Sequence, residues 1–297
     1  MNLHLFGAAT PTGEAFSRQV VHAEIPWSLY PYSRRSATTP ADFTNPSAFQ
    51  PAGTPRDPAL WISFGPIWLL APFIEQLCCS HPERLAGLRG LIACSSSSAI
   101  TKRFASNRFD RDLVARLNGA EDTLFAICRR LEVPCYVLQP SLIYGQVGPY
   151  GDRNLSQLLK LLRRLPLLPL PAETGLRQPI HASQLAAVAL HIAEQLRGSI
   201  DVPCLQERIT LGGDSSLTYA SMLKALQQAQ ASGDAAHRCQ LLPIPNRLFF
   251  SLASPLLLRS PKAFEALLRM GANLSGFTPA HQLLGSEPQP FPVLPLA

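Results

Sequence analysis

The N-terminal stretch Leu3-His4-Leu5-Phe6-Gly7-Ala8-Ala9-Thr10-Pro11-Thr12-Gly13 decides the fold. A short apolar run is followed at once by a loop with a glycine at each end, and an amphipathic stretch continues to about His22. A short apolar run that ends at a glycine is typical of a buried strand, and amphipathic periodicity is typical of a helix. We therefore predict a strand, a tight loop and a helix in the first 22 residues.

Further apolar runs alternate with helical segments along the rest of the chain. Near-continuous apolar strands indicate burial on both faces, which favours a parallel sheet between two layers of helices. We predict an α/β fold, a Rossmann-type doubly wound parallel sheet with a small C-terminal substrate lobe. The expected strands are 25–32, 60–64, 88–94, 135–138 and 208–211, with a short one near Phe49, and the expected helices are 68–79, 110–131, 154–164, 184–196, 217–230 and most of 246–270.

We expect three regions. A Rossmann core spans 1–145, a smaller and mostly helical lobe spans 146–270 and packs on the core, and a loosely ordered tail rich in Pro and Gly spans 271–297. The chain is long enough to bury a core, and 46% apolar with 15% charged residues is a globular composition.

Composition also limits the classes of partner and the cellular location that we expect for the chain. The net charge is +6, but Lys and Arg are scattered with no run of five, so we expect no nucleic-acid partner. No apolar run is long enough to span a bilayer, and no secretory signal is visible, so we expect no membrane contact. The seven cysteines form no CxxC pair and are expected to be buried, reduced thiols of a cytoplasmic protein. The histidines lack ligand spacing, so no metal site is expected.

The first loop is the best candidate for a cofactor site. A dinucleotide pyrophosphate needs a glycine-rich turn and the free N–H groups of a helix N-terminus. Gly7 and Gly13 have the outer spacing of such a loop, whereas the middle position is Thr10, whose side chain keeps the phosphates further away. We expect cofactor contacts from Gly7, Ala9, Thr10, Pro11, Thr12 and Gly13. An ordinary strand–turn–helix unit remains the alternative.

Ser33-Arg34-Arg35 follows the second strand, where a Rossmann fold faces the adenosine ribose. An acidic residue there prefers NAD, whereas an arginine pairs with the 2′-phosphate of NADP. We therefore expect Arg34 to select NADP, with NAD as the other possible cofactor. Two solvated surface arginines are the alternative interpretation.

Four segments in order resemble an extended or atypical short-chain dehydrogenase/reductase of the NAD-dependent epimerase/dehydratase type. They are Gly7 to Gly13, Ser95 to Ser98, the stretch Gln139-Pro140-Ser141-Leu142-Ile143-Tyr144-Gly145, and Arg177-Gln178-Pro179-Ile180-His181. The resemblance covers about residues 1–225. It implies further cofactor contacts from Phe64, Gly65, Ser95 and Pro140.

The same resemblance implies a catalytic Ser or Thr at Ser97, followed by a Tyr and a Lys on the next helix. Aligning Ala120-Glu121 with the usual Ala-Glu of that helix places these two positions at Leu113 and Leu117, which transfer no proton. Lys102 and Tyr144 are the remaining candidates for an acid or base, because Lys102 follows the serine run and Tyr144 ends a strand. A surface lysine and a packed aromatic ring are the alternatives.

The family often binds a nucleotide-sugar diphosphate from its lobe, which suggests substrate contacts from Asn154, Arg177 and His181. A surface arginine and a satisfied core histidine are the plain alternatives. Our leading hypothesis is an NAD(P)-dependent oxidoreductase or epimerase-like enzyme acting on a nucleotide-sugar or a similar small molecule. The alternative is a non-catalytic NAD(P)-binding module with a sensing, assembly or structural role, which the loss of the Tyr and Lys favours.

Overall fold

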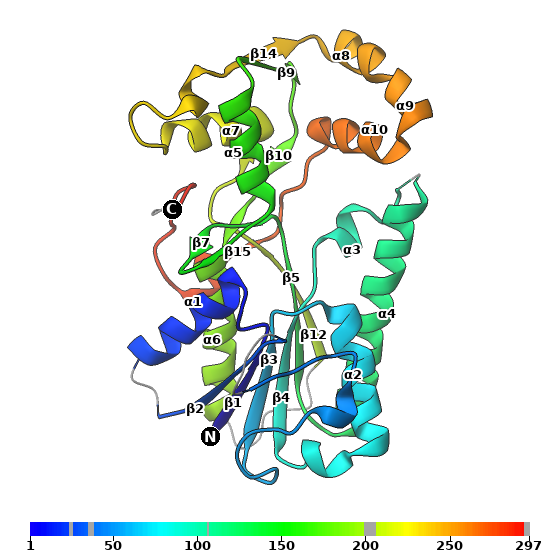
Figure 1. Cartoon of the computed structure of the whole chain (residues 1–297), viewed down its shortest axis with the longest axis vertical. Helices are drawn as coiled ribbons and strands as arrows, with labels where there is room; N and C mark the ends of the chain where they lie inside the picture. Colours follow the sequence, from blue (N-terminus) through cyan, green and yellow to red (C-terminus); the bar gives the residue numbers. More distant parts are fainter. Residues whose placement is uncertain (24–25, 35–38, 106, 199–205, 294–297) are drawn as a thin grey trace.

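The central sheet has seven strands, and every neighbouring pair is parallel (Figure 1). The computed structural model describes residues 1–23, 26–34, 39–105, 107–198 and 206–293 of the chain. This confirms the predicted doubly wound fold. In spatial order the strands are β15 (Thr278–Pro279), β12 (Gln206–Gly212), β5 (Cys135–Pro140), β4 (Leu88–Cys94), β3 (Ala59–Ser63), β1 (Asn2–Phe6) and β2 (Ser28–Tyr32).

Helices cover both faces of the sheet, which explains why its central strands are apolar throughout. Strands β1 and β3 are buried at every residue. Helices α1 (Pro11–His22) and α6 (Ala182–Gly198) pack together on one face, and α2 (Ile67–Ser80) and α4 (Arg108–Arg130) pack together on the other (Figure 1). Burial on both faces requires near-continuous apolar strands, as the sequence predicts.

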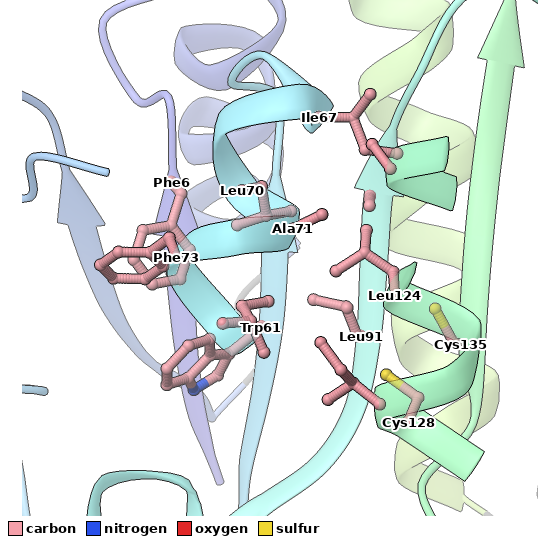
Figure 2. Packing of buried hydrophobic residues seen from close by; sticks show 14 of the residues in the cluster. Phe6, Trp61, Ile67, Leu70, Ala71, Phe73, Leu91, Leu124, Cys128 and Cys135 are labelled. Carbon is pink, nitrogen blue, oxygen red and sulfur yellow. The ribbon is translucent and has the colours of Figure 1, made fainter. Parts of the chain in front are cut away.

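Aromatic rings fill the core between the sheet and α2. The ring of Phe6 lies 5.1 Å from those of both Tyr32 and Trp61, and Phe49 packs edge-on against Phe73 at 5.3 Å. Such tilted and edge-to-face pairs add to the free energy gained by burying the rings. Figure 2 shows Phe6, Trp61 and Phe73 between the strands and α2, with α4 completing the layer.

Segments after residue 145 contribute both to the sheet and to a separate lobe. Helix α6 and strands β12 and β15 return to the sheet, so the sheet extends beyond the expected core of residues 1–145. The lobe lies at the carboxyl end of the strands (Figure 1). It contains α5 (Asn154–Arg164), α7 (Tyr219–Gln228), α8 (Asn246–Ala253), α9 (Pro255–Arg259), α10 (Pro261–Leu268) and the parallel pair β9 (Leu167–Pro171) and β14 (Gln240–Ile244).

Short elements join the sheet to the lobe. They are α3 (Ser98–Thr101), β6 (Ile143–Tyr144) with β11 (Ile180–His181), β7 (Gln146–Val147) with β8 (Tyr150–Gly151), β10 (Leu176–Arg177) with β13 (Leu217–Thr218), and α11 (Ala280–Leu284). The strand expected near Phe49 is absent from the described residues. A 3₁₀ turn, η1 (Pro46–Ala48), is found there, and Phe49 is a buried core ring. Because no strand forms near Phe49 among the described residues, β3 is the third strand of the chain and not the fourth, as expected, and Gly65-Pro66 follows it.

The C-terminal segment is docked as far as Val293, which corrects the expectation of a loose tail. Strand β15 adds to the sheet edge beside β12, and the N–H of Gln289 donates to the Asp214 carboxylate at 2.9 Å. Proline and glycine punctuate this segment, but a strand pairing and side-chain acceptors on the lobe hold it in place.

The cysteines are free thiols in the described part of the chain. Cys128, Cys135 and Cys239 are buried, whereas Cys79 is exposed, contrary to expectation, on the last turn of α2. Cys204 lies outside the described residues, as does Arg35. Among the helices that the structure describes, none is both long and apolar enough to cross a bilayer.

Candidate functional site

The loop between β1 and α1 lies at the carboxyl edge of the sheet and packs closely against the end of β3. Gly7 has a φ of +78°, and a side chain on it would lie 2.8 Å from the backbone nitrogen of Gly65. A side chain on Gly13 would lie 2.3 Å from the Gly7 carbonyl oxygen. Both outer glycines are therefore required by the fold of the loop itself.

Thr10 and Pro11 reduce the number of amides that this loop can offer to an anion. The Thr10 hydroxyl accepts the N–H of Gly13 at 3.0 Å and donates to the Gly7 carbonyl at 2.8 Å. Pro11, the first residue of α1, has no N–H. Of the first three residues of α1, only Thr12 has an N–H left for a phosphate. Pro11 has none, and the N–H of Gly13 is bonded to the Thr10 hydroxyl.

Arg34 and Gly65 are the residues expected at the adenosine end of the cofactor site. Arg34 is exposed one residue beyond Ser33, which bridges to Pro40 after the end of β2. Gly65 lies against the ring of Phe43, where a side chain on Gly65 would come within 2.8 Å of that ring. Arg34 is solvent-facing and lies within electrostatic range of Asp42, because hydrogen bonds from Thr44 and then the charge of Arg34 lower the pKa of that carboxyl.

Ser95, predicted to touch the cofactor, has its hydroxyl directed elsewhere. It donates a short hydrogen bond to the buried carboxylate of Glu121, and its N–H donates to the Leu138 carbonyl at 2.7 Å. Glu121 also accepts from Gln139 at 2.9 Å and forms an ion pair with Arg208 at 2.8 Å. These contacts fix α4 to the ends of β4 and β5 and to Arg208 within β12.

Ser97 is the catalytic candidate whose hydroxyl is least engaged. It is buried at the start of α3, and its N–H donates to the Pro140 carbonyl at 2.9 Å, which joins two of the predicted residues. Its side chain makes no capping hydrogen bond to α3. Ser97 and Pro140 therefore lie next to each other at the carboxyl ends of β4 and β5.

Lys102 forms an ion pair and does not present a free ammonium group. Its ammonium lies 2.8 Å from the carboxylate of Asp110. Asp110 also accepts hydrogen bonds from Asn107 and from Arg269 of the lobe, and Glu265 bonds to both of these residues. We call these five residues the Asp110 cluster. Burial raises the pKa of Asp110, but hydrogen bonds from Asn107, Lys102 and Arg269 outweigh it and hold the pKa below its usual range.

Tyr144 is buried beneath the C-terminal segment. Its hydroxyl accepts the N–H of Val293 at 2.8 Å, and the ring of Phe291 packs edge-on against it at 5.0 Å. Burial raises the pKa of Tyr144 to about 12, and the Val293 hydrogen bond offsets only part of this. A phenol in this position is poorly placed to exchange a proton with a ligand.

The three substrate candidates in the lobe differ in their environment. Asn154 is exposed at the first residue of α5. Arg177 is buried and donates to the carbonyls of Leu176, Arg269 and Ala272, so its guanidinium holds the backbone of the lobe. His181 is buried too, its Nδ1 lies 2.6 Å from the Ser183 hydroxyl, and burial lowers its pKa.

Solved structures share this architecture across nearly the whole chain. No protein-family model and no curated protein sequence matches it. A nucleoside-diphosphate-sugar epimerase from Staphylococcus aureus superposes with a TM-score of 0.60, at 19% identity over 98% of both chains. A human epimerase family protein solved with NADPH gives 0.62, at 11% identity over 96% of this chain and 93% of the other.

A third likeness is UDP-glucuronic acid 4-epimerase from Bacillus cereus, solved with UDP-glucuronic acid and NAD. Its TM-score is 0.60, at 11% identity over 97% of this chain and 94% of the other. The chain shares the overall fold of these proteins. Within this fold, α4 carries Leu113 and Leu117 where the resemblance places the Tyr and the Lys. Leu117 is buried in the core beside α2.

Three features of this site are not evident from the sequence. The buried carboxylate of Glu121, bonded to Ser95, Gln139 and Arg208, is the first. The Asp110 cluster is the second, because Glu265 of α10 and Arg269, which directly follows α10, lie 158 and 159 residues beyond their partners Asn107 and Asp110. The third is the contact of Val293 with Tyr144, for which the sequence carries no local signal.

Proposed function

We propose that this chain binds NADP(H) at the carboxyl edge of its sheet and acts as a dinucleotide-binding module with a sensing or assembly role. The observation that carries the proposal is the burial of the Tyr144 hydroxyl beneath Val293. Leu113 and Leu117 supply no proton, and Lys102 is held by Asp110. The groups that would move a proton in an enzyme of this kind are thus absent or occupied.

Dinucleotide binding is supported by the first loop and by Arg34. The close approach of Gly7 to Gly65 creates the tight turn that a pyrophosphate site needs, and the Thr12 amide points from the start of α1. Arg34 suits the 2′-phosphate of NADP. Structures of the same fold have been solved with NADPH and with NAD. A bound dinucleotide would supply hydride chemistry, but the binding role needs only the residues that hold the dinucleotide.

An enzyme acting on a nucleotide-sugar is the second candidate, and Ser97 favours it. Its hydroxyl makes no capping bond to α3, and its backbone N–H is bonded to Pro140, so the side chain could polarise a reacting oxygen. Asn154 is exposed on the lobe and could contact a sugar diphosphate. Arg177 contributes less to this hypothesis, because its guanidinium already binds three backbone carbonyls.

Turnover separates the two candidates. NADPH fluorescence is followed on mixing with the purified chain. Turnover of a panel of nucleotide-sugars is then measured both as net NADPH oxidation or NADP reduction and by chromatography of the sugar products, because an epimerase returns the hydride to its substrate and leaves the cofactor unchanged. We expect saturable binding and no turnover, with the same binding in Ser97→Ala and Lys102→Ala. Turnover by the wild-type chain that disappears in Ser97→Ala would establish the enzyme and reject the module.

A further inference from the structure

Large apolar side chains are exposed at two places that are distant in sequence. At the junction of α3 and α4, Phe104 is 87% exposed and Phe109 is 69% exposed. On the lobe, Leu252 of α8 is 67% exposed and Leu258 of α9 is 93% exposed. Single exposed leucines are ordinary, but a group of such residues on one side of a protein marks a contact surface.

The Asp110 cluster brings these two places together. Asn107, between Phe104 and Phe109, bonds to Glu265 of α10. Arg269, which directly follows α10, forms an ion pair with Asp110. Figure 1 shows α10 next to the α3–α4 junction, with α9 and α8 continuing outward from it. We call the exposed side of residues 98–112 and 246–270 the α8–α10 face.

Helix α8 shows that this face is not simply the outside of a folded lobe. Phe249 and Ala253 pack inward and are buried. Leu248 and Leu252, which also lie four residues apart, form a second apolar stripe and are 53% and 67% exposed. A helix that is apolar on both sides normally has both sides covered. Within the described residues, only the side of α8 that carries Phe249 and Ala253 is covered.

Charge indicates what covers the other side. Residues 98–112 and 246–270 together contain eight of the 26 Lys and Arg residues but only three of the 20 Asp and Glu residues. They carry a net charge of +5, whereas the whole chain carries +6. Two of the three acids, Asp110 and Glu265, are engaged in the Asp110 cluster. Arg103, Arg247 and Arg259 are exposed beside the apolar residues.

We propose that the α8–α10 face docks on the surface of an anionic lipid membrane. Leucine and phenylalanine side chains enter the boundary between headgroups and acyl chains, while arginines meet the lipid phosphates. A second copy of the chain fits less well, because a two-fold contact would place two strongly positive faces together. Nucleic acid would use the arginines but not Leu252 and Leu258. A peripheral contact of this kind needs no spanning helix.

Vesicle flotation tests the proposal with the full chain. One set of vesicles contains phosphatidylcholine alone, and the other contains roughly 30% phosphatidylglycerol, which supplies anionic headgroups. We expect the protein to float with the anionic vesicles only, and to float less as salt is raised. The double variant Leu252→Ser/Leu258→Ser should bind about tenfold more weakly, because two apolar anchors are lost.

Val21→Ser is the matched control. Val21 is 71% exposed on α1, far in sequence from the face, so its loss should leave flotation unchanged. Thermal melting confirms that each variant is folded, as expected for substitutions at exposed positions. The proposal is overturned if the wild type does not float, or if the double variant floats equally well. It is also overturned if light scattering shows a dimer that the double variant breaks, because the face then binds a second copy.

Discussion

The hydroxyl of Thr10 accepts the N–H of Gly13 at 3.0 Å, so the chain caps the helix end that it would otherwise offer to a phosphate. A threonine at the middle position of the loop also keeps an approaching phosphate at a distance. With Pro11 next to it, the start of α1 offers fewer N–H donors than the proposed dinucleotide site would otherwise have.

Thr10→Gly should therefore strengthen NADPH binding. It frees the Gly13 amide for a hydrogen bond to phosphate, which we expect to improve the dissociation constant about tenfold. Glycine at a helix cap should lower the free energy of unfolding by only a few tenths of a kcal/mol. Thr10→Ser, which keeps the capping hydroxyl, is the control and should bind like the wild type. Titration of NADPH fluorescence measures both, and equal affinities for Thr10→Gly and Thr10→Ser would contradict the assignment.

His4 should make stability fall on mild acidification. Burial lowers the pKa of His4 to about 4, and its Nδ1 lies 3.0 Å from the Tyr32 hydroxyl. The unfolded chain takes up the proton near pH 6.5, before the folded chain does. The contribution of His4 is thus complete above pH 6.5 and is lost as the pH falls to about 4, at a cost of about 3 kcal/mol.

Urea unfolding of the wild type and of His4→Gln across this pH range measures the effect. The variant cannot titrate at residue 4, so the difference between the two curves isolates His4 from the carboxylates. We expect the wild type to lose more stability than the variant between pH 6.5 and 4. Parallel curves would show that His4 does not remain neutral in the fold.

Glu121 should be among the most sensitive polar positions of the core. Its carboxylate is buried, accepts hydrogen bonds from Ser95 and Gln139, and forms an ion pair with Arg208. Glu121→Leu leaves their polar groups without a partner, and we expect a loss of about 3 kcal/mol in the free energy of unfolding. Asp122→Asn removes a charge from the same arginine at an exposed position and should change stability by less than about 0.5 kcal/mol. Similar losses for the two variants in urea unfolding would refute the buried role of Glu121.

Tyr144→Phe should loosen the C-terminal segment without unfolding the protein. It removes the acceptor for the Val293 N–H, a hydrogen bond expected to contribute about 1 kcal/mol. Hydrogen exchange read by NMR should show faster exchange at Val293. The Gln289 amide, which is bound to Asp214, should exchange at its wild-type rate. An unchanged rate at Val293 would mean that this contact does not hold the segment.

The fold could be predicted from the sequence because local patterns determine it. The apolar runs at 60–64 and 88–94 require burial on both faces, and the glycines at 7 and 13 fit a turn that tolerates no side chain. The strand expected near Phe49 does not form in the described residues around it: an aromatic residue has strand propensity, but the neighbouring prolines cannot donate to a sheet and Pro46–Ala48 is a 3₁₀ turn. The ring of Phe49 instead fills the space between Tyr32 and Phe73.

The site was less predictable, because pairings between distant residues decide it. Lys102 follows the serine run as expected, but its partner Asp110 is held in turn by Arg269, 159 residues further on. The burial of Tyr144 depends on Val293, 149 residues away. Residue type and spacing can nominate a proton donor, but only the tertiary contacts show whether it is free to act.

The most direct test of this account is calorimetric titration of the purified chain with NADPH and with NADH, in the wild type and in Arg34→Ala. We predict saturable binding of one dinucleotide per chain, with NADPH bound about tenfold more tightly than NADH and this preference lost in Arg34→Ala. Failure of both dinucleotides to bind the wild-type chain would contradict the assignment of residues 7–13 as a dinucleotide site.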